Sequence, residues 1–263
     1  MFLSVKSIKN FVSLNGFLLC MGFLQYRLVE DANVYILFCM YVSRNYGLLY
    51  FIEYITQNKK GLENIPKESY PYEFHVNICT TTAIETVTHL CMYPMNTQSV
   101  YKDVVWFVPM SLLFEIMFDF FHYWSHRMVH HTYVYKYIHK KHHTFKHPTA
   151  ITTFYQDPLD LILTNSLPTL LTMWLIPNMS ICQFHWIIVY KNFVEISGHS
   201  GKYLRPSCSF PQCIWIVKWL EIELYAEDHD AHHSINGCNY GKRFSLWDKM
   251  FGTYRCIMEK KVD

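Results

Sequence analysis

The chain has 263 residues, with 23 Lys or Arg against 21 Asp or Glu, so its formal net charge is only +2. That balance gives no sign of the basic face that a nucleic-acid-binding protein needs. Aromatic residues make up 17% of the chain, which can therefore bury a large core or lie in a bilayer, and its length permits one large or two small domains.

Six apolar segments predict helices, several of them with the roughly 20 residues that a membrane span needs. In chain order they are 11–24, 34–55, 74–93, 104–124, 159–176 and 180–197. We expect 11–24 to be a weaker span and 74–93 to be an interfacial segment. Polar residues interrupt several of these segments, as Arg44 and Asp119 do, so the buried helices of a soluble all-α protein are the alternative.

The distribution of positive charge favours the membrane. The turn between 159–176 and 180–197 is uncharged, whereas residues 122–157 contain several basic side chains. These are Arg127, Lys136, Lys140, Lys141 and Lys146. Because lysine and arginine mark the cytoplasmic side of membrane proteins, residues 122–157 are predicted to lie there.

Aromatic residues also mark the ends of the apolar segments, as Trp106 and Trp124 do, which is typical of a membrane interface. From residue 199 onward the chain becomes polar and rich in turn residues. We therefore expect an all-α integral membrane protein in which transmembrane helical hairpins carry a cytoplasmic, histidine-rich cap that holds a di-metal site.

Three histidine clusters, "HYWSH", "HKKHH" and "HDAHH", stand out among the 15 histidines. They supply His122 and His126, then His139, His142 and His143, and finally His229, His232 and His233. On a helix, residues three or four apart share a face, so each cluster can present two or three imidazoles to one centre. Two copies of HxxHH beside an HxxxH are not expected by chance in a chain of this composition.

A ninth histidine, His199, follows the predicted hairpin, which returns the chain to the side where the second cluster lies. Neutral imidazole suits zinc, copper, iron and nickel. Because one structural zinc takes four ligands, these nine histidines predict two metal ions. His130, His131 and His147 lie beside the clusters and are left out of the predicted set, since a helix turn cannot direct every neighbour inward.

Acidic residues accompany the clusters. Metal-ligating histidines commonly donate their second N–H to a carboxylate, which fixes the tautomer. Asp119, three residues before His122, and Asp230, next to His229, are the predicted carboxylates of this kind. Glu195, four residues before His199, is a candidate carboxylate ligand.

Taken together, "DFFHYWSHRMVHH", "YKYIHKKHHTFKHP", "GHSG", "HDAHH" and "WDKMFGTYR" closely resemble the fatty acid hydroxylase/sterol desaturase superfamily of membrane di-iron enzymes. Within it, "YKYIHKKHH" is most similar to the 4-methylsterol oxidases. The resemblance implies a catalytic domain over 100–263, preceded by an N-terminal membrane-associated region over 1–99. It also implies a helical membrane hairpin core, a cytoplasmic site with two iron ions, and electrons from NAD(P)H through cytochrome b5 and its reductase.

The chain ends in "KKVD", where Lys260 and Lys261 resemble the dilysine retrieval signal of endoplasmic reticulum membrane proteins. This ending predicts a multi-pass protein of the endoplasmic reticulum membrane, with its active site and C-terminus in the cytoplasm. A basic tail without a targeting role is the alternative.

Attack on an unactivated C–H bond requires a redox metal that activates O2, which zinc cannot do. We therefore expect an O2-dependent lipid hydroxylase or oxidase, with a sterol as the favoured substrate from the bilayer. The main alternative is a sterol or fatty acyl desaturase, which shares the metal chemistry. A di-zinc hydrolase and a non-catalytic lipid-binding protein are less favoured.

Overall fold

The structure is a computed structural model that describes residues 5–29, 32–62, 72–92, 95–176, 178–205, 209–235 and 237–256. Over these residues its regular structure is helical, and β pairing is limited to two isolated bridges, Gly61 with Lys202 and Asn96 with Ser180. This confirms the expected all-α fold. The predicted retrieval signal at Lys260 and Lys261 lies outside the described residues.

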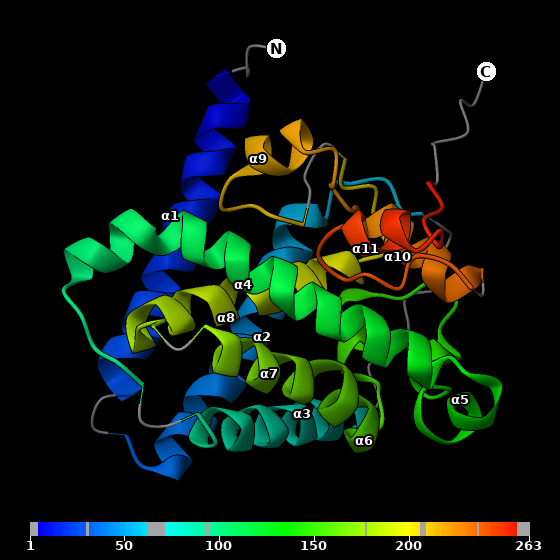
Figure 1. The fold of residues 1–263 in the computed structure, drawn as a ribbon, viewed down its shortest axis with the longest axis horizontal. Helices are drawn as coiled ribbons and strands as arrows, with labels where there is room; N and C mark the ends of the chain where they lie inside the picture. Colours follow the sequence, from blue (N-terminus) through cyan, green and yellow to red (C-terminus); the bar gives the residue numbers. More distant parts are fainter. Residues whose placement is uncertain are drawn as a thin grey trace.

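The helices follow one another in the order drawn in Figure 1. They are α1 (Val5–Val29), α2 (Val34–Thr56), α3 (Tyr72–Leu90), α4 (Val100–Val129), α5 (Thr132–Ile138), the 3-10 turns η1 (His142–Thr144) and η2 (Ala150–Phe154), α6 (Pro158–Leu161), the π turn η3 (Ile162–Ser166), α7 (Leu167–Leu175), α8 (Ile181–Gly198), α9 (Ile214–Trp219), α10 (Ala226–Ser234) and α11 (Leu246–Met250). Each of the six predicted apolar segments is largely helical.

Helix α8 lies at the centre of the molecule, in contact with α1, α2 and α4 (Figure 1). A capping box starts it, since the Ser180 hydroxyl accepts the backbone N–H of Gln183 at 3.1 Å and the Gln183 side chain accepts the N–H of Ser180. Every residue from Ile181 to Ile196 is buried. Helix α8, predicted as one arm of a membrane hairpin, is thus surrounded by protein.

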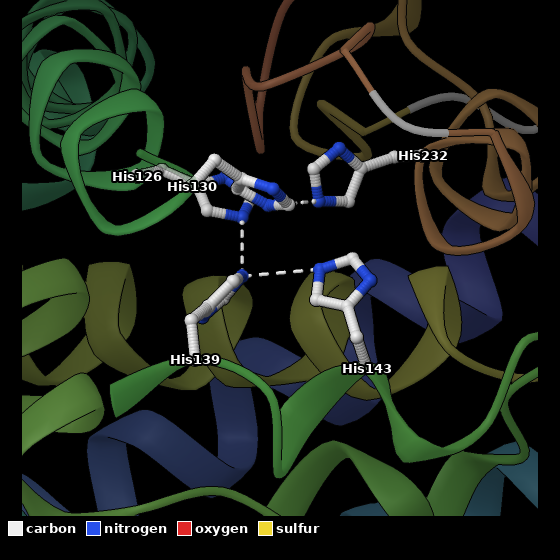
Figure 2. Close-up of side chains that lie close together, drawn as sticks. All are labelled: His126, His130, His139, His143 and His232. Carbon is white, nitrogen blue, oxygen red and sulfur yellow. Dashed lines mark hydrogen bonds between the residues drawn. The ribbon is translucent and has the colours of Figure 1, made fainter. Parts of the chain in front are cut away.

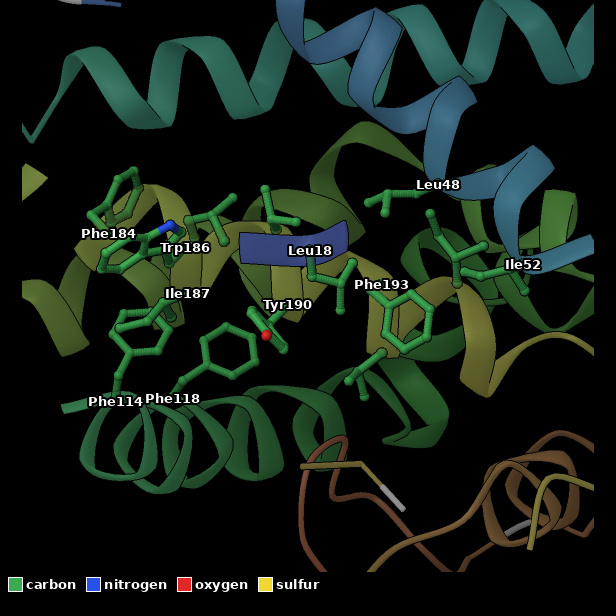
Figure 3. Close-up of a cluster of buried hydrophobic side chains, with 14 of the residues drawn as sticks. Leu18, Leu48, Ile52, Phe114, Phe118, Phe184, Trp186, Ile187, Tyr190 and Phe193 are labelled. Atoms are coloured by element: carbon green, nitrogen blue, oxygen red, sulfur yellow. The ribbon is translucent and has the colours of Figure 1, made fainter. Parts of the chain in front are cut away.

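One hydrophobic core joins the two halves of the chain (Figure 3). Leu18 of α1 and Leu48 of α2 lie in the same buried cluster as Phe114 of α4 and Tyr190 of α8. Burial of a large apolar side chain contributes about 1.5–3 kcal/mol, so this shared cluster stabilises both halves together. The predicted region 1–99 therefore packs directly on the predicted catalytic domain.

Two helical segments are long and apolar enough to cross a membrane, Ile8–Val29 and Val100–Val129. Only 33% of the most apolar window in Val100–Val129 is buried, and its exposed face includes Val104, Val105 and Trp106. Such an apolar surface over a 30-residue helix is typical of a helix that contacts lipid. The number of membrane crossings and their orientation stay predictions.

Candidate metal centre

Nine buried or half-buried histidines form two neighbouring groups. The first histidine group contains His126, His130, His139, His143 and His232, and the second contains His142, His199, His229 and His233. In each group, one ring nitrogen of every member lies within 4.8 Å of those of the others. Figure 2 shows the five rings of the first group arranged around a common centre.

The ends of several helices bring these side chains together. Helix α4 supplies His126 and ends at its cap residue His130. His139 caps α5, and His199 caps α8. The remaining members come from the 3-10 turn η1, with His142 and His143, and from α10, with His229, His232 and His233. The second predicted cluster is thus a helix cap followed by a 3-10 turn, and it is not one continuous α-helix.

Each HxxHH cluster divides between the two groups. The ring planes of the adjacent residues His142 and His143 lie 86° apart, and those of His232 and His233 lie 88° apart. Consecutive residues project about 100° apart around an α-helix and about 120° apart around a 3-10 turn, so adjacent histidines face different centres. Each HxxHH cluster presents two imidazoles to one group, as its spacing predicted, and contributes its third imidazole to the other group.

Backbone carbonyls orient several of the rings. The Nδ1 atoms of His126, His199 and His232 each lie 2.8 Å from a buried carbonyl oxygen. The acceptors are the carbonyls of Tyr240, Glu195 and Cys238, respectively. A carbonyl can only accept, so each Nδ1 carries the proton and each neutral ring keeps a bare lone pair on Nε2.

A carboxylate holds one further ring in the same way. The Nδ1 of His139 lies 2.8 Å from Oδ2 of Asp160, which is fully buried in α6. When Nδ1 of His139 donates its proton to this carboxyl group, Nε2 is left bare and faces the first histidine group. Carboxylate–histidine pairs of this kind commonly orient metal ligands.

These bare nitrogens face one another at short range, which indicates a cation between them. In the first group, Nε2 of His139 lies 3.1 Å from Nε2 of His126. In the second group, the bare Nε2 of His199 lies 3.3 Å from Nε2 of His142 and 3.0 Å from that of His229, so three ring nitrogens converge there. Two lone pairs on the first pair of nitrogens repel each other unless a cation accepts both. The residues present therefore fit a pair of metal ions.

Burial also keeps the rings neutral. It lowers the pKa of His232 to about 4 and that of His143 to about 2, and it holds the pKa of His233 well below its usual range. Neither ring nitrogen of His233 has a hydrogen-bond partner among the described residues. Because metal-binding imidazoles must be deprotonated, these side chains are ready to act as ligands near pH 7.

The family model for fatty acid hydroxylase matches residues 111–253, a segment that contains both histidine groups. This chain belongs to the fatty acid hydroxylase family. The match confirms the resemblance seen in the sequence motifs, and it lies inside the predicted catalytic domain 100–263.

Three similar relatives illustrate the range of the family. The fatty acid hydroxylase vlmA of Lecanicillium sp is 32% identical over 61% of this chain and 46% of its own length. A Delta(7)-sterol 5(6)-desaturase, ERG3A of Gibberella zeae, is 34% identical over 56% and 37%, and the C-4 methylsterol oxidase erg25 of Schizosaccharomyces pombe is 27% identical over 61% and 52%. The chain thus spans about half the length of these relatives, or less. No solved structure matches it.

The histidines that the structure groups together differ from the predicted ligand set at two positions. His122 lies outside both groups, with its ring 4.9 Å from that of His126 and its Nδ1 bonded to the carbonyl of Thr164 at 2.6 Å. That carbonyl lacks its usual α-helical donor because Pro168, four residues on, has no N–H. His130, which the prediction left out, belongs to the first group, and its position four residues after His126 is the signal that could have identified it.

The three predicted acidic residues contact other partners. Asp119 accepts the backbone N–H of Lys242 at 2.7 Å, so it acts on the loop that follows α10. Asp230 lies 3.0 Å from Nδ1 of His147, a ring outside both groups. The Glu195 carboxylate pairs with Lys242, and only its backbone carbonyl reaches His199.

Asp160 is the carboxylate that contacts a group member, and the sequence prediction missed it. It lies inside the apolar segment 159–176, where a buried polar group requires a hydrogen-bond partner. An aspartate inside an apolar segment was the signal available from the sequence, but its partner, His139, becomes evident only in the tertiary structure.

Proposed function

We propose that this chain is a membrane-bound di-iron oxygenase that hydroxylates or oxidises an unactivated C–H bond of a lipid. The observation that carries the proposal is the pair of adjacent, buried imidazole groups, each with bare nitrogens directed at its centre. Bound iron supplies O2 activation, which an imidazole-rich site suits. Relatives named as a fatty acid hydroxylase and as a sterol oxidase support a lipid substrate, and we favour a sterol.

In this proposal both histidine groups bind metal, while His122 stays a candidate ligand beside the first group. Asp160 and the carbonyls of Tyr240 and Glu195 orient the imidazoles through their Nδ1 atoms. The groups are mostly buried, which limits water at the site and strengthens electrostatic interactions there. Asp119 supports the site indirectly, through the loop that carries Tyr240, and Asp230 does so through His147.

The reaction needs an electron supply, because one oxygen atom enters the lipid and the other leaves as water with two electrons and two protons. We propose NAD(P)H, cytochrome b5 and its reductase as that supply, on the cytoplasmic face of the endoplasmic reticulum. The exposed side chains of Lys136, Lys140 and Lys146 lie on the segment that bears the second cluster. This basic surface suits an acidic electron donor.

A desaturase is the second candidate function, because one similar relative is named as a sterol desaturase. It would use the same metal groups and remove two hydrogens where the oxygenase inserts an oxygen. A di-zinc hydrolase is less favoured because the two groups contain imidazoles without a bridging carboxylate among the described residues. The same complete groups argue against a non-catalytic lipid-binding protein.

The full-length chain should be tested in membranes that contain cytochrome b5, its reductase and NADH. We expect the wild type to hold iron and to form an oxygenated lipid that depends on O2, as seen by mass spectrometry. His142→Ala and His232→Ala should lose iron and lower product formation at least about 100-fold, since each removes a ligand.

His75→Ala is the matched control, because His75 is exposed and its Nδ1 contacts the Tyr46 hydroxyl at 2.7 Å. It should keep both iron and turnover. Full activity in the His232→Ala variant would exclude the proposed site. A product with a new double bond would identify a desaturase, and native zinc without oxygen consumption would favour a hydrolase.

A further inference from the structure

A cavity of about 850 Å³ lies beside the second histidine group. Its walls include Leu14 of α1, Phe51 of α2 and Phe193 of α8, and His199 and His229 also line it. Ligand pockets commonly have volumes of about 300–1,000 Å³ and mostly apolar walls. Its apolar walls beside the proposed metals make this cavity the place where a lipid would meet the reaction centre.

The cavity contains one basic side chain close to the histidines, Lys242. Its Nζ lies 2.5 Å from Oε1 of Glu195, and only 11% of the side chain is exposed. Lys242 lines the cavity together with His199 and His229. An ammonium group has three N–H donors, and Glu195 is the hydrogen-bond partner of its Nζ among the described residues. Donors therefore remain for a ligand in the cavity.

Glu195 neutralises Lys242 only in part, because other cations share the same carboxylate. Lys191 Nζ lies 3.3 Å from Oε2 of Glu195. The guanidinium of Arg243 lies 3.9 Å from the same oxygen, although its nearer carboxylate is that of Glu115, at 2.9 Å. Asn165 also donates to this carboxylate, at 2.9 Å. A buried cation whose counter-ion is shared in this way binds an additional oxygen acceptor favourably.

We propose that Lys242 binds the oxygen-bearing polar group of the lipid substrate and thereby places the neighbouring carbons at the second histidine group. The substrate is then a lipid whose hydroxyl, carbonyl or carboxylate lies within a few bonds of the carbon that reacts. The apolar remainder of the lipid extends along Leu14, Phe51 and Phe193. This inference rests on the proposed function, since it names the substrate class of the same site.

A lipid bound in the reverse direction, with its polar group at the far end of the cavity, is the competing arrangement. Gln57, Asn58 and Lys59 also line the cavity, at the end of α2 and in the residues that follow. A lipid with its polar group at these residues would present a carbon remote from that group to the histidines. Lys242 is favoured as the anchor because its ammonium group, with 11% of the side chain exposed, lines the cavity next to the histidine group, whereas Lys59 is exposed.

The test measures lipid binding by the full-length, metal-loaded protein in nanodiscs. Two matched pairs of probes are used: stearic acid with n-octadecane, and cholesterol with cholestane. We expect Lys242→Met to weaken binding of the oxygen-bearing member of one pair by about tenfold or more, with the hydrocarbon member unchanged. The pair that responds distinguishes an acyl from a sterol substrate.

Lys242→Arg should retain most of the binding, because it keeps both the charge and the donors. Lys249→Met is the matched control, since Lys249 is exposed and does not line the cavity. If Lys242→Met fails to fold, Lys242→Gln replaces it, with the same expected loss. Metal content is measured on every variant.

Equal weakening of both members of each pair would show that Lys242 acts only on the shape of the cavity, and would overturn the proposal. Unchanged binding would overturn it as well and would move the polar group to the Lys59 end. Failure of the proposed function is distinguished from failure of this inference, because the wild type would then bind lipid without oxidising it.

Discussion

Adjacent histidines in the HxxHH clusters belong to different histidine groups, and two groups can hold two metal ions. His142 belongs to the second histidine group and His143 to the first, and His233 and His232 divide in the same way. The closest rings across the two groups are those of His143 and His233, with centroids 4.5 Å apart. Each HxxHH cluster therefore links the two proposed metal positions directly.

The difference between His122 and His130 can be tested by metal analysis. His130→Ala should remove a ligand from the first histidine group and lower the metal content from about two ions per chain toward one. His122→Ala should retain more metal, because His122 lies outside both groups. Inductively coupled plasma mass spectrometry on the purified variants measures this. The reverse order of metal loss would favour the set predicted from the sequence.

The sequence predicted eight of the nine grouped histidines because helical spacing alone places them near one another. It could not choose between His122 and His130, since both share the inward face of α4 with His126. The choice depends on where the tertiary fold places the two rings, because an Nδ1 bond to a backbone carbonyl holds both His122, outside the groups, and His126, inside the first group. Likewise, Asp160 meets His139 only after α6 packs beside the cluster.

At the scale of the helices, α1 and α8 approach each other closely at a glycine, Gly22. A Cβ at Gly22 would lie 2.6 Å from Cδ1 and 3.0 Å from Cα of Trp186. The indole N–H of Trp186 donates to the carbonyl of Leu19 at 3.0 Å. Small residues that allow close backbone contact are common where helices pack in membranes.

Gly22→Ala should therefore destabilise the protein by about 1–3 kcal/mol, because α1 must move away from Trp186. Gly16→Ala is the matched control in the same helix, since a Cβ there meets no atom within 4 Å. Its higher helix propensity should stabilise the protein by up to about 1 kcal/mol. Thermal unfolding followed by tryptophan fluorescence compares the two. Equal effects would contradict the packing described for Gly22.

Helix existence was predictable from the apolar segments, but helix interruptions were not. The predicted segment 159–176 is divided into α6, the π turn η3 and α7. The missing N–H of Pro168 explains why Thr164 has a carbonyl to offer a ring, yet the sequence alone does not show which ring takes it. The burial of α8 also required the tertiary structure, because an apolar segment suits lipid and core equally well.

Across the whole molecule, the two histidine groups join elements from residue 126 to residue 233. Bound metals would therefore act as cross-links between the end of α4, the turn η1, the end of α8 and α10. Ligands that bind only the folded state stabilise it by about 4 kcal/mol at a thousand times their dissociation constant.

Removal of metal with a chelator should lower the melting temperature on the order of 10 °C. Differential scanning fluorimetry in detergent measures this change, with metal analysis to verify removal. Added iron should restore both stability and turnover, whereas zinc should restore stability alone. A melting temperature that stays constant after verified removal would show that the metals do not connect these elements.

The histidine groups and part of the cavity wall come from different parts of the chain, so mutations can change one without the other. The histidines lie within the part of the chain that the family model matches, residues 111–253, whereas Leu14 and Phe51 precede it. Mutations in α1 and α2 can therefore reshape part of the cavity wall while the histidine groups stay unchanged. If the cavity binds the lipid as proposed, changes in these two helices would alter the choice of substrate and leave the proposed metal centre as it is.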